Sequence, residues 1–189
     1  MSVPDDAPAA VATMDDDAVR ARVRALLDWG GTELDLLSSA FRPCSPEQLA
    51  EITAMQRADA LPAAYHELLR VTGQGGIGSA IAEIFPGDDV DCASIMEAED
   101  WIGMRALAEE IAVGATPSLD LSGHAVIRVH RLSSFEYVDV NHPDPPVWCF
   151  TETAHVPRLE EPSFTAWLER RIGRAIKRRY PLRDAHFAG

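Results

Sequence analysis

Hydrophobic residues recur every three or four positions in the first third of the chain, which is the spacing of one face of a helix. A first helix is predicted to begin at residues 15–17, because their aspartate carboxylates suit the exposed N–H groups of a first turn. Its apolar stripe consists of Val19, Val23, Leu26 and Leu27. We expect this helix to end at about Trp29, since Gly30 and Gly31 are typical of helix ends.

A short helix is expected around Leu34 and Leu37. The two helices that follow it carry clearer boundary signals. Residues 45–48 (S-P-E-Q) combine an N-cap, a proline at the first helical position and a capping box. The inward side chains of that helix are predicted to be Leu49, Ile52 and Met55. Pro62 then opens a helix that Gly73 ends. Its buried face is predicted to consist of Tyr65, Leu68, Leu69 and Thr72.

Alternation of apolar and polar residues predicts strands in the second half. Residues 125–130 and 135–140 alternate in this way, and 132–134 can join them as a hairpin. Residues 147–150 form the next predicted strand, whereas the three prolines of 141–146 exclude that segment from a sheet. A short strand is also predicted at 81–85, closed by a turn at 86–89.

Helices are predicted on both sides of these strands. Ser94 and Glu97 form a capping box that opens a helix reaching about Ala112. A last helix starts at Pro162 and ends at Pro181. Its apolar stripe consists of Phe164, Trp167, Leu168, Ile172, Ala175 and Ile176. Strands clustered between helices favour an α+β fold, with a mostly antiparallel sheet packed by helices.

The composition adds few constraints on function. The chain has 189 residues, 47% of them apolar, which fits one globular domain, and its three cysteines form no C-x-x-C pair. We therefore expect a reduced, cytoplasmic setting without a disulfide framework. No run of 18 apolar residues occurs, so no membrane span is predicted.

The charge is divided unevenly along the chain. Residues 1–100 hold 19 acidic and 6 basic side chains, a net charge of −13, whereas residues 101–189 hold 11 of each. Such a surface repels nucleic acid and favours a basic partner, although acidity also serves solubility. The last helix is basic at Arg170, Arg171, Arg174, Lys177, Arg178 and Arg179. This cluster has three interpretations. The cations stabilise the C-terminal end of the helix through its dipole, they contact a membrane or nucleic acid, or they pair with the acidic half of this or another molecule.

Most motifs with possible chemistry lack the context that the chemistry needs. Residues 73–78 match G-x-G-x-x-G, but a helix precedes them where a dinucleotide site needs a strand. His66 has no second zinc ligand four residues later, so we expect a solvated histidine. Cys44 and Cys92 lie in predicted loops, and Cys149 is expected as a small apolar filler. No catalytic residue, metal or other cofactor is predicted.

An acidic segment is the best candidate for a contact surface. Its acidic residues do not have the ligand spacing of an EF-hand calcium loop. Two interpretations remain, a solvated loop or a contact patch for a basic partner. The candidate partner-binding residues are Asp88, Asp89, Asp91, Glu99, Asp100 and Trp101. The tryptophans at 29, 101, 148 and 167 are expected in the core, and an exposed one would be a candidate interface anchor.

Three segments in this order resemble the SMI1/KNR4 family, also called the SUKH superfamily. The first is the segment L-P-A-A-Y-H-E-L-L at 61–69 with the glycines that follow it. The second comprises Val138-Asp139 and P-P-V-W at 145–148, and the third is S-F-T-A-W-L at 163–168. A similar apolar strand with a P-G turn lies at 84–87. The resemblance covers residues 45–172, with an acidic extension before it (1–44) and a basic one after it (173–189).

The resemblance implies an α+β fold and a role in protein binding rather than catalysis. Bacterial members of the family are read as immunity proteins that neutralise a cognate toxin, frequently a nuclease, and fungal members regulate cell-wall synthesis. An immunity protein is therefore the first expectation, with a regulatory or scaffold protein as the alternative. A hydrolase is a third hypothesis, and it requires Cys92 or Cys149 to be hydrogen-bonded to His124, His130 or His142.

Overall fold

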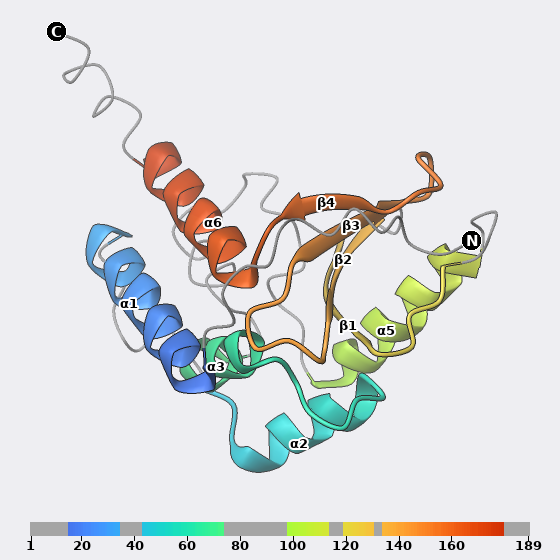
Figure 1. Ribbon diagram of the computed structural model, residues 1–189, viewed down its shortest axis with the longest axis horizontal. Helices are drawn as coiled ribbons and strands as arrows, with labels where there is room; N and C mark the ends of the chain where they lie inside the picture. The colour runs from blue at the N-terminus through green and yellow to red at the C-terminus, as the bar shows by residue number, and fades with distance from the viewer. Residues whose placement is uncertain (1–14, 35–42, 74–97, 114–118, 131–133, 180–189) are drawn as a thin grey trace, which may run out of the picture.

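An antiparallel sheet with helices packed against it forms the centre of the computed structural model (Figure 1). The structure describes residues 15–34, 43–73, 98–113, 119–130 and 134–179. These hold five helices, α1 (Asp16–Leu34), α2 (Pro46–Met55), α3 (Ala63–Thr72), α5 (Ala98–Val113) and α6 (Phe164–Arg179). They also hold four strands, β1 (His124–His130), β2 (Ser134–Asp139), β3 (Val147–Thr151) and β4 (Arg158–Glu161). The predicted α+β class is confirmed.

The sheet is a meander in which each strand pairs antiparallel with the next, in the order β1-β2-β3-β4. The three predicted strands of the second half are β1, β2 and β3. The fourth, β4, was not predicted, because its sequence R-L-E-E has one apolar residue and no alternation to detect. It lies at the sheet edge, where a strand needs little apolar surface.

The local signals at α2 and α3 are confirmed in detail. The Ser45 hydroxyl accepts a hydrogen bond from the Gln48 N–H, and the Gln48 side chain accepts one from the Ser45 N–H. At the end of α3, Gly73 has φ +78° and donates its N–H to the Leu69 carbonyl, a backbone conformation that favours glycine. The four residues predicted for the buried face of α3 are all buried.

The predicted end of α1 is wrong, because the helix continues through both glycines to Leu34. Gly30 is buried and lies against Ile172 of α6, where an added Cβ would be 3.0 Å from Ile172 Cγ2. The missing side chain therefore lets two helices approach closely, whereas Gly31 has open space around its Cα. Glycine here serves helix packing rather than termination.

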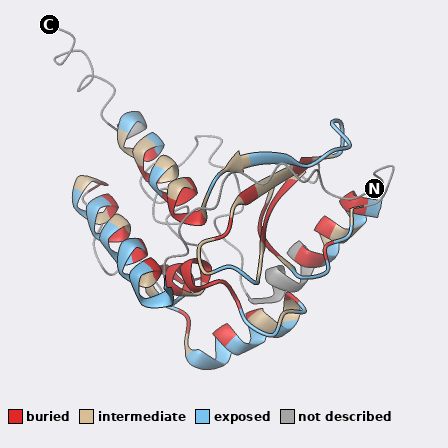
Figure 2. Cartoon of the chain, viewed as in Figure 1, coloured by how far each residue is buried: buried red, intermediate tan, exposed pale blue. Residues whose placement is uncertain are grey.

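The hydrophobic core lies between the sheet and the helices that surround it. α1 packs against α3 and α6, while α5 packs against β1 and α2. Buried residues line the inward faces of these elements (Figure 2). Phe135, Phe150 and Phe164 are the largest fully buried side chains. Val19, Val23 and Leu27 of α1, which lies in the predicted N-terminal extension, belong to the same core cluster.

Several predictions concern residues that lie outside the described ranges. They include the helix around Leu37, the strand at 81–85 with its turn, the capping box at Ser94 and Glu97, and the stop at Pro181. The helix predicted to reach Ala112 is α5, and the last predicted helix is α6.

Candidate functional site

The acidic contact segment predicted from sequence is only partly covered by the structure. Asp88, Asp89 and Asp91 lie outside the described residues, while Glu99, Asp100 and Trp101 lie in the first turn of α5. The structure describes the backbone of this first turn and not its side chains. These residues stay candidates for partner binding.

Exposed carboxylates without an ionic partner lie on the described part of the acidic half. Asp17, Asp28, Glu51 and Asp59 are exposed, and within the described residues they form no ion pair. Glu51 stands four residues after the exposed Glu47, on the face of α2 opposite the core. The sequence reasoning missed this surface, although the helical spacing of the two glutamates would have indicated it.

The arginines of the same half are, by contrast, engaged inside the molecule. Within the described residues, each of the five arginines of residues 15–73 contacts a carboxylate or a histidine. Arg20 contacts Asp16 and His66, Arg22 contacts Glu169, Arg24 and Arg70 contact Glu67, and Arg57 contacts Glu109. Among the described residues of this half, the arginines are therefore matched by partners within the molecule, and the carboxylates without an ion pair face solvent.

Glu67 is the centre of one such cluster, between α1 and α3. Its side chain is 1% exposed, and it accepts hydrogen bonds from the guanidinium groups of Arg70 and Arg24. The hydrogen bonds from Arg70, and then those from Arg24, lower the pKa of Glu67 to about 2 despite its burial. The carboxylate is therefore charged at neutral pH and ties the two helices together.

His66 differs from the solvated histidine that we expected, because it is half-buried beside α1. Its Nδ1 lies 3.2 Å from Nη1 of Arg20, so the ring accepts this hydrogen bond in its neutral form. Burial and the charge of Arg20 lower the pKa of His66. The residue is one more contact between α1 and α3 rather than a ligand.

The first two basic residues of α6, Arg170 and Arg171, form ion pairs with carboxylates of the sheet. Arg170 pairs with Glu160 and Glu161 of β4, and Arg171 donates to Glu136 of β2 at 3.0 and 3.1 Å. Arg171 also lies over the ring of Trp167, 4.9 Å from its centroid. Pairing with the acidic first half, one of the three interpretations of this cluster, is not what these two arginines do within the described residues, because their carboxylate partners belong to the sheet.

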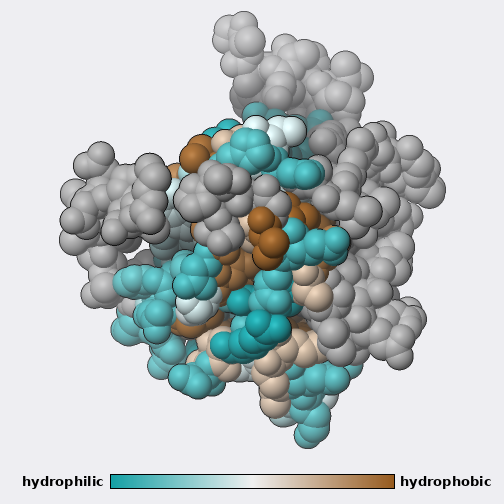
Figure 3. Space-filling model, turned by 90° about the vertical axis from the view of Figure 1, so that its right-hand side faces the viewer, coloured by the Kyte–Doolittle hydropathy of each residue, from teal (hydrophilic) through white to brown (hydrophobic). Residues whose placement is uncertain are grey.

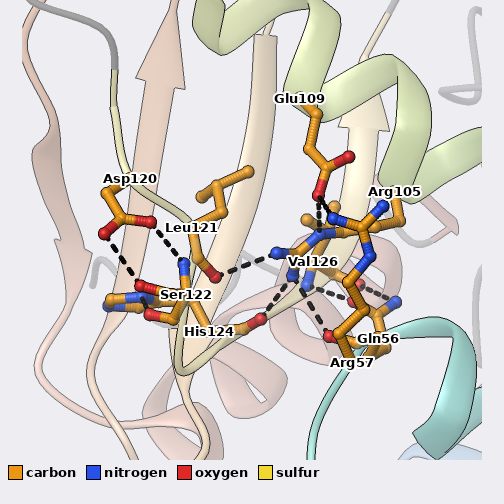
Figure 4. A network of polar contacts seen from close by, with 9 residues as sticks. All are labelled: Gln56, Arg57, Arg105, Glu109, Asp120, Leu121, Ser122, His124 and Val126. Atoms are coloured by element: carbon orange, nitrogen blue, oxygen red, sulfur yellow. Dashed lines mark hydrogen bonds and ion pairs between the residues drawn. The ribbon is translucent and has the colours of Figure 1, made fainter.

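A buried polar network joins α2, α5 and β1 (Figure 4). The Gln56 side chain, 1% exposed, accepts a hydrogen bond from the Val126 N–H at 2.9 Å and donates one to the Val126 carbonyl at 3.1 Å. Arg105 donates to three main-chain carbonyls, those of Gln56, Leu121 and His124, and to the carboxylate of Glu109. Because its guanidinium is committed to these acceptors, this arginine stabilises the fold rather than binding a ligand.

The described cysteines are poorly placed for nucleophilic catalysis. Cys44 is buried and Cys149 is half-buried; burial raises the pKa of both thiols, and the carboxylates of Glu136 and Glu160 raise that of Cys149 further. Within the described residues, Cys149 bonds neither His124 nor His142: its thiol contacts the Phe150 carbonyl, and His142 lies beside Asp139, while the side chain of His130 is not described. The His124 ring contacts the Ser122 carbonyl at 2.8 Å, and Cys92 lies outside the described residues.

The tryptophans do not all lie in the core as predicted. Trp167 is buried, Trp148 is half-buried and Trp29 is 40% exposed. The expectation for Trp29 is wrong because α1 turns its buried stripe toward α3 and α6, which leaves position 29 on the solvent side next to Asp28. An exposed tryptophan beside a free carboxylate is a candidate anchor for a protein partner.

The described residues show neither a metal site nor a membrane span. On the side shown in Figure 3, hydrophobic residues appear at several places among hydrophilic ones in the described part of the surface. Within the described ranges, no three His, Cys, Asp or Glu side chains lie close enough together to hold a metal ion. None of the described helices combines the length and apolar character that crossing a membrane requires.

Comparisons of the chain with protein-family models, with curated proteins and with solved structures found no match. The resemblance to the SMI1/KNR4 family therefore stays a prediction from the three motifs.

Proposed function

We propose that the protein is a non-enzymatic binding module of the immunity type, which neutralises a cognate toxin by covering a basic substrate cleft. The observation that carries the proposal is the uncompensated acidity of the first half. Its described arginines are matched inside the molecule, while Asp17, Asp28, Glu51 and Asp59 are exposed and unpaired within the described residues. A toxin that cleaves nucleic acid has a basic cleft to fit such a surface.

The proposed mechanism is occlusion assisted by charge. Long-range attraction between an acidic face and a basic cleft raises the rate of encounter, and a few well-packed anchors determine how long the complex lasts. Trp29 is the anchor candidate within the described residues. The acidic segment with Asp88, Asp89 and Asp91 is the candidate for steering.

The test is co-expression of this protein with the products of neighbouring genes, followed by measurement of binding and of protection from toxicity. The triple variant Asp88→Asn, Asp89→Asn, Asp91→Asn should slow association by about tenfold and flatten its dependence on salt. The matched control removes three exposed carboxylates from the neutral half, at Glu110, Asp120 and Glu152, for which the described residues show no ion pair. The association rate of that control should stay within about twofold of the wild-type rate, because the charges that it removes lie outside the acidic half.

Binding that responds equally to both triple variants would refute steering by this segment. If no neighbouring product binds, and a pull-down instead recovers cell-wall or signalling proteins, the toxin role is refuted and the regulatory alternative takes its place.

A further inference from the structure

The two edges of the sheet differ in how their main-chain groups are covered. At the β1 edge, the Gln56 amide occupies the hydrogen-bonding groups of Val126 as a neighbouring strand would. At the β4 edge, among the described residues, only β3 pairs with the strand. An uncovered edge strand presents main-chain donors and acceptors to any strand that fits it.

An apolar cross-strand row runs through the sheet and ends at β4, which among the described residues pairs only with β3. Val126 lies opposite Tyr137, Tyr137 opposite Trp148, and Trp148 opposite Leu159. Burial decreases along the row, from fully buried Val126 through half-buried Trp148 to Leu159, which is 39% exposed. Directly opposed apolar side chains stabilise one another across a strand pair, and within the described residues the row has no partner beyond Leu159.

The charges of β4 indicate which strand can supply that partner. Arg158 and Glu160 lie on one face of the sheet, as their 2.7 Å ion pair shows, and Leu159 lies on the other with Trp148. In an antiparallel pair of two β4 strands related by a two-fold axis at Leu159, each Arg158 lies opposite Glu160 of the other copy. The two Leu159 side chains then lie opposite each other, so the strand is complementary to itself.

We propose that β4 pairs antiparallel with β4 of a second copy of this chain, centred on Leu159, and joins the described four-stranded sheets of the two copies. Pro157, which has no N–H to donate, limits the pairing at one end, and the register shift of β4 against β3 between Leu159 and Glu161 limits it at the other, so it involves Arg158, Leu159 and Glu160 of each copy. The dimer is consequently weak and depends on concentration. The proposal is independent of toxin binding, since it involves none of the acidic residues of the first half.

The first experiment is analytical ultracentrifugation of the full chain from micromolar to millimolar concentration. The wild type should shift from monomer to dimer across this range. Leu159→Lys places two like charges opposite each other and should weaken the dimer by roughly tenfold or more. Because Leu159 is partly exposed, this variant should keep its circular dichroism spectrum and thermal transition.

The second experiment uses a pair of charge reversals that only the proposed register explains. Arg158→Glu alone places Glu opposite Glu, and Glu160→Arg alone places Arg opposite Arg, so each variant should be monomeric where the wild type dimerises. An equimolar mixture places Glu opposite Arg at both positions and should form a heterodimer. Glu160 also pairs with Arg170, which keeps Glu161 as a partner in Glu160→Arg, so circular dichroism and the thermal transition check the fold of that variant.

A wild type that stays monomeric at millimolar concentration overturns the proposal. It is equally overturned if Leu159→Lys dimerises like the wild type, or if the two reversed variants do not associate when mixed. Toxin neutralisation by the Leu159→Lys monomer would leave the proposed function intact, so the two proposals fail separately.

Discussion

Replacing Gln56 by methionine should destabilise the protein far more than its position at the end of a helix suggests. Methionine fills a similar volume but makes no hydrogen bond, so the packing is retained while the N–H and carbonyl of Val126 lose their partner. Both groups lie in the interior, where an unsatisfied donor or acceptor costs about 1–3 kcal/mol. The expected loss is therefore about 2–6 kcal/mol, a large part of the stability of an ordinary domain.

Urea unfolding followed by circular dichroism measures this loss, with an unchanged m-value as the sign that the unfolded state is unaffected. Hydrogen exchange gives a local measurement, because the Val126 amide should lose protection when its acceptor is removed. Gln48→Met is the matched control on the same helix. Gln48 is exposed and serves one arm of the capping box, so this change should cost about 0.5–1 kcal/mol. Equal losses for the two variants, with Val126 still protected, would refute the structural role assigned to Gln56.

Two further substitutions test the contacts of α1. Glu67→Gln should cost about 2–3 kcal/mol at neutral pH, because the folded-state pKa of Glu67 is about 2 instead of 4.5. That stability is present above pH 4.5 and is lost as the pH falls toward 2, so unfolding measured across this range should depend less on pH in the variant; a profile like that of the wild type would contradict this reasoning. Gly30→Val should destabilise by about 1–3 kcal/mol in thermal unfolding because its side chain meets Ile172, whereas Gly31→Ala, with open space, should stabilise by about 0.5–1 kcal/mol. A Gly30→Val protein as stable as the wild type would show that the two helices do not pack closely there.

Helices α2 and α3 could be predicted because their signals lie within a few residues of one another. The capping box at Ser45 and the positive φ of Gly73 are set by backbone chemistry that the local sequence specifies. The end of α1 could not be predicted in the same way. Gly30 does not end the helix, because the approach of Ile172, 142 positions later in the chain, decides what that glycine does.

The candidate binding surface and its basic partner stay predictions. The charge division indicated a basic partner, and the exposed carboxylates of α1 and α2 are consistent with it. Which arginines cancel which carboxylates depends on neighbours distant in sequence, as in the pairing of Arg24 with Glu67 or of Arg171 with Glu136. Counting charges along the chain gives the total but does not identify which carboxylates stay unpaired.

By itself, the sequence determined the class of fold, the strands β1, β2 and β3, the start of α2, both ends of α3, and the sign of the net charge. These depend on periodicity, capping and composition, which act over short distances along the chain. Only the tertiary structure decided that β4 forms, that Trp29 is exposed, and that Gln56 and Arg105 satisfy main-chain groups of β1. Each of these depends on segments that meet only after folding. In the interior an unpaired polar group is costly, so side chains distant in sequence must satisfy it, whereas the main-chain groups of an edge strand can be satisfied by water.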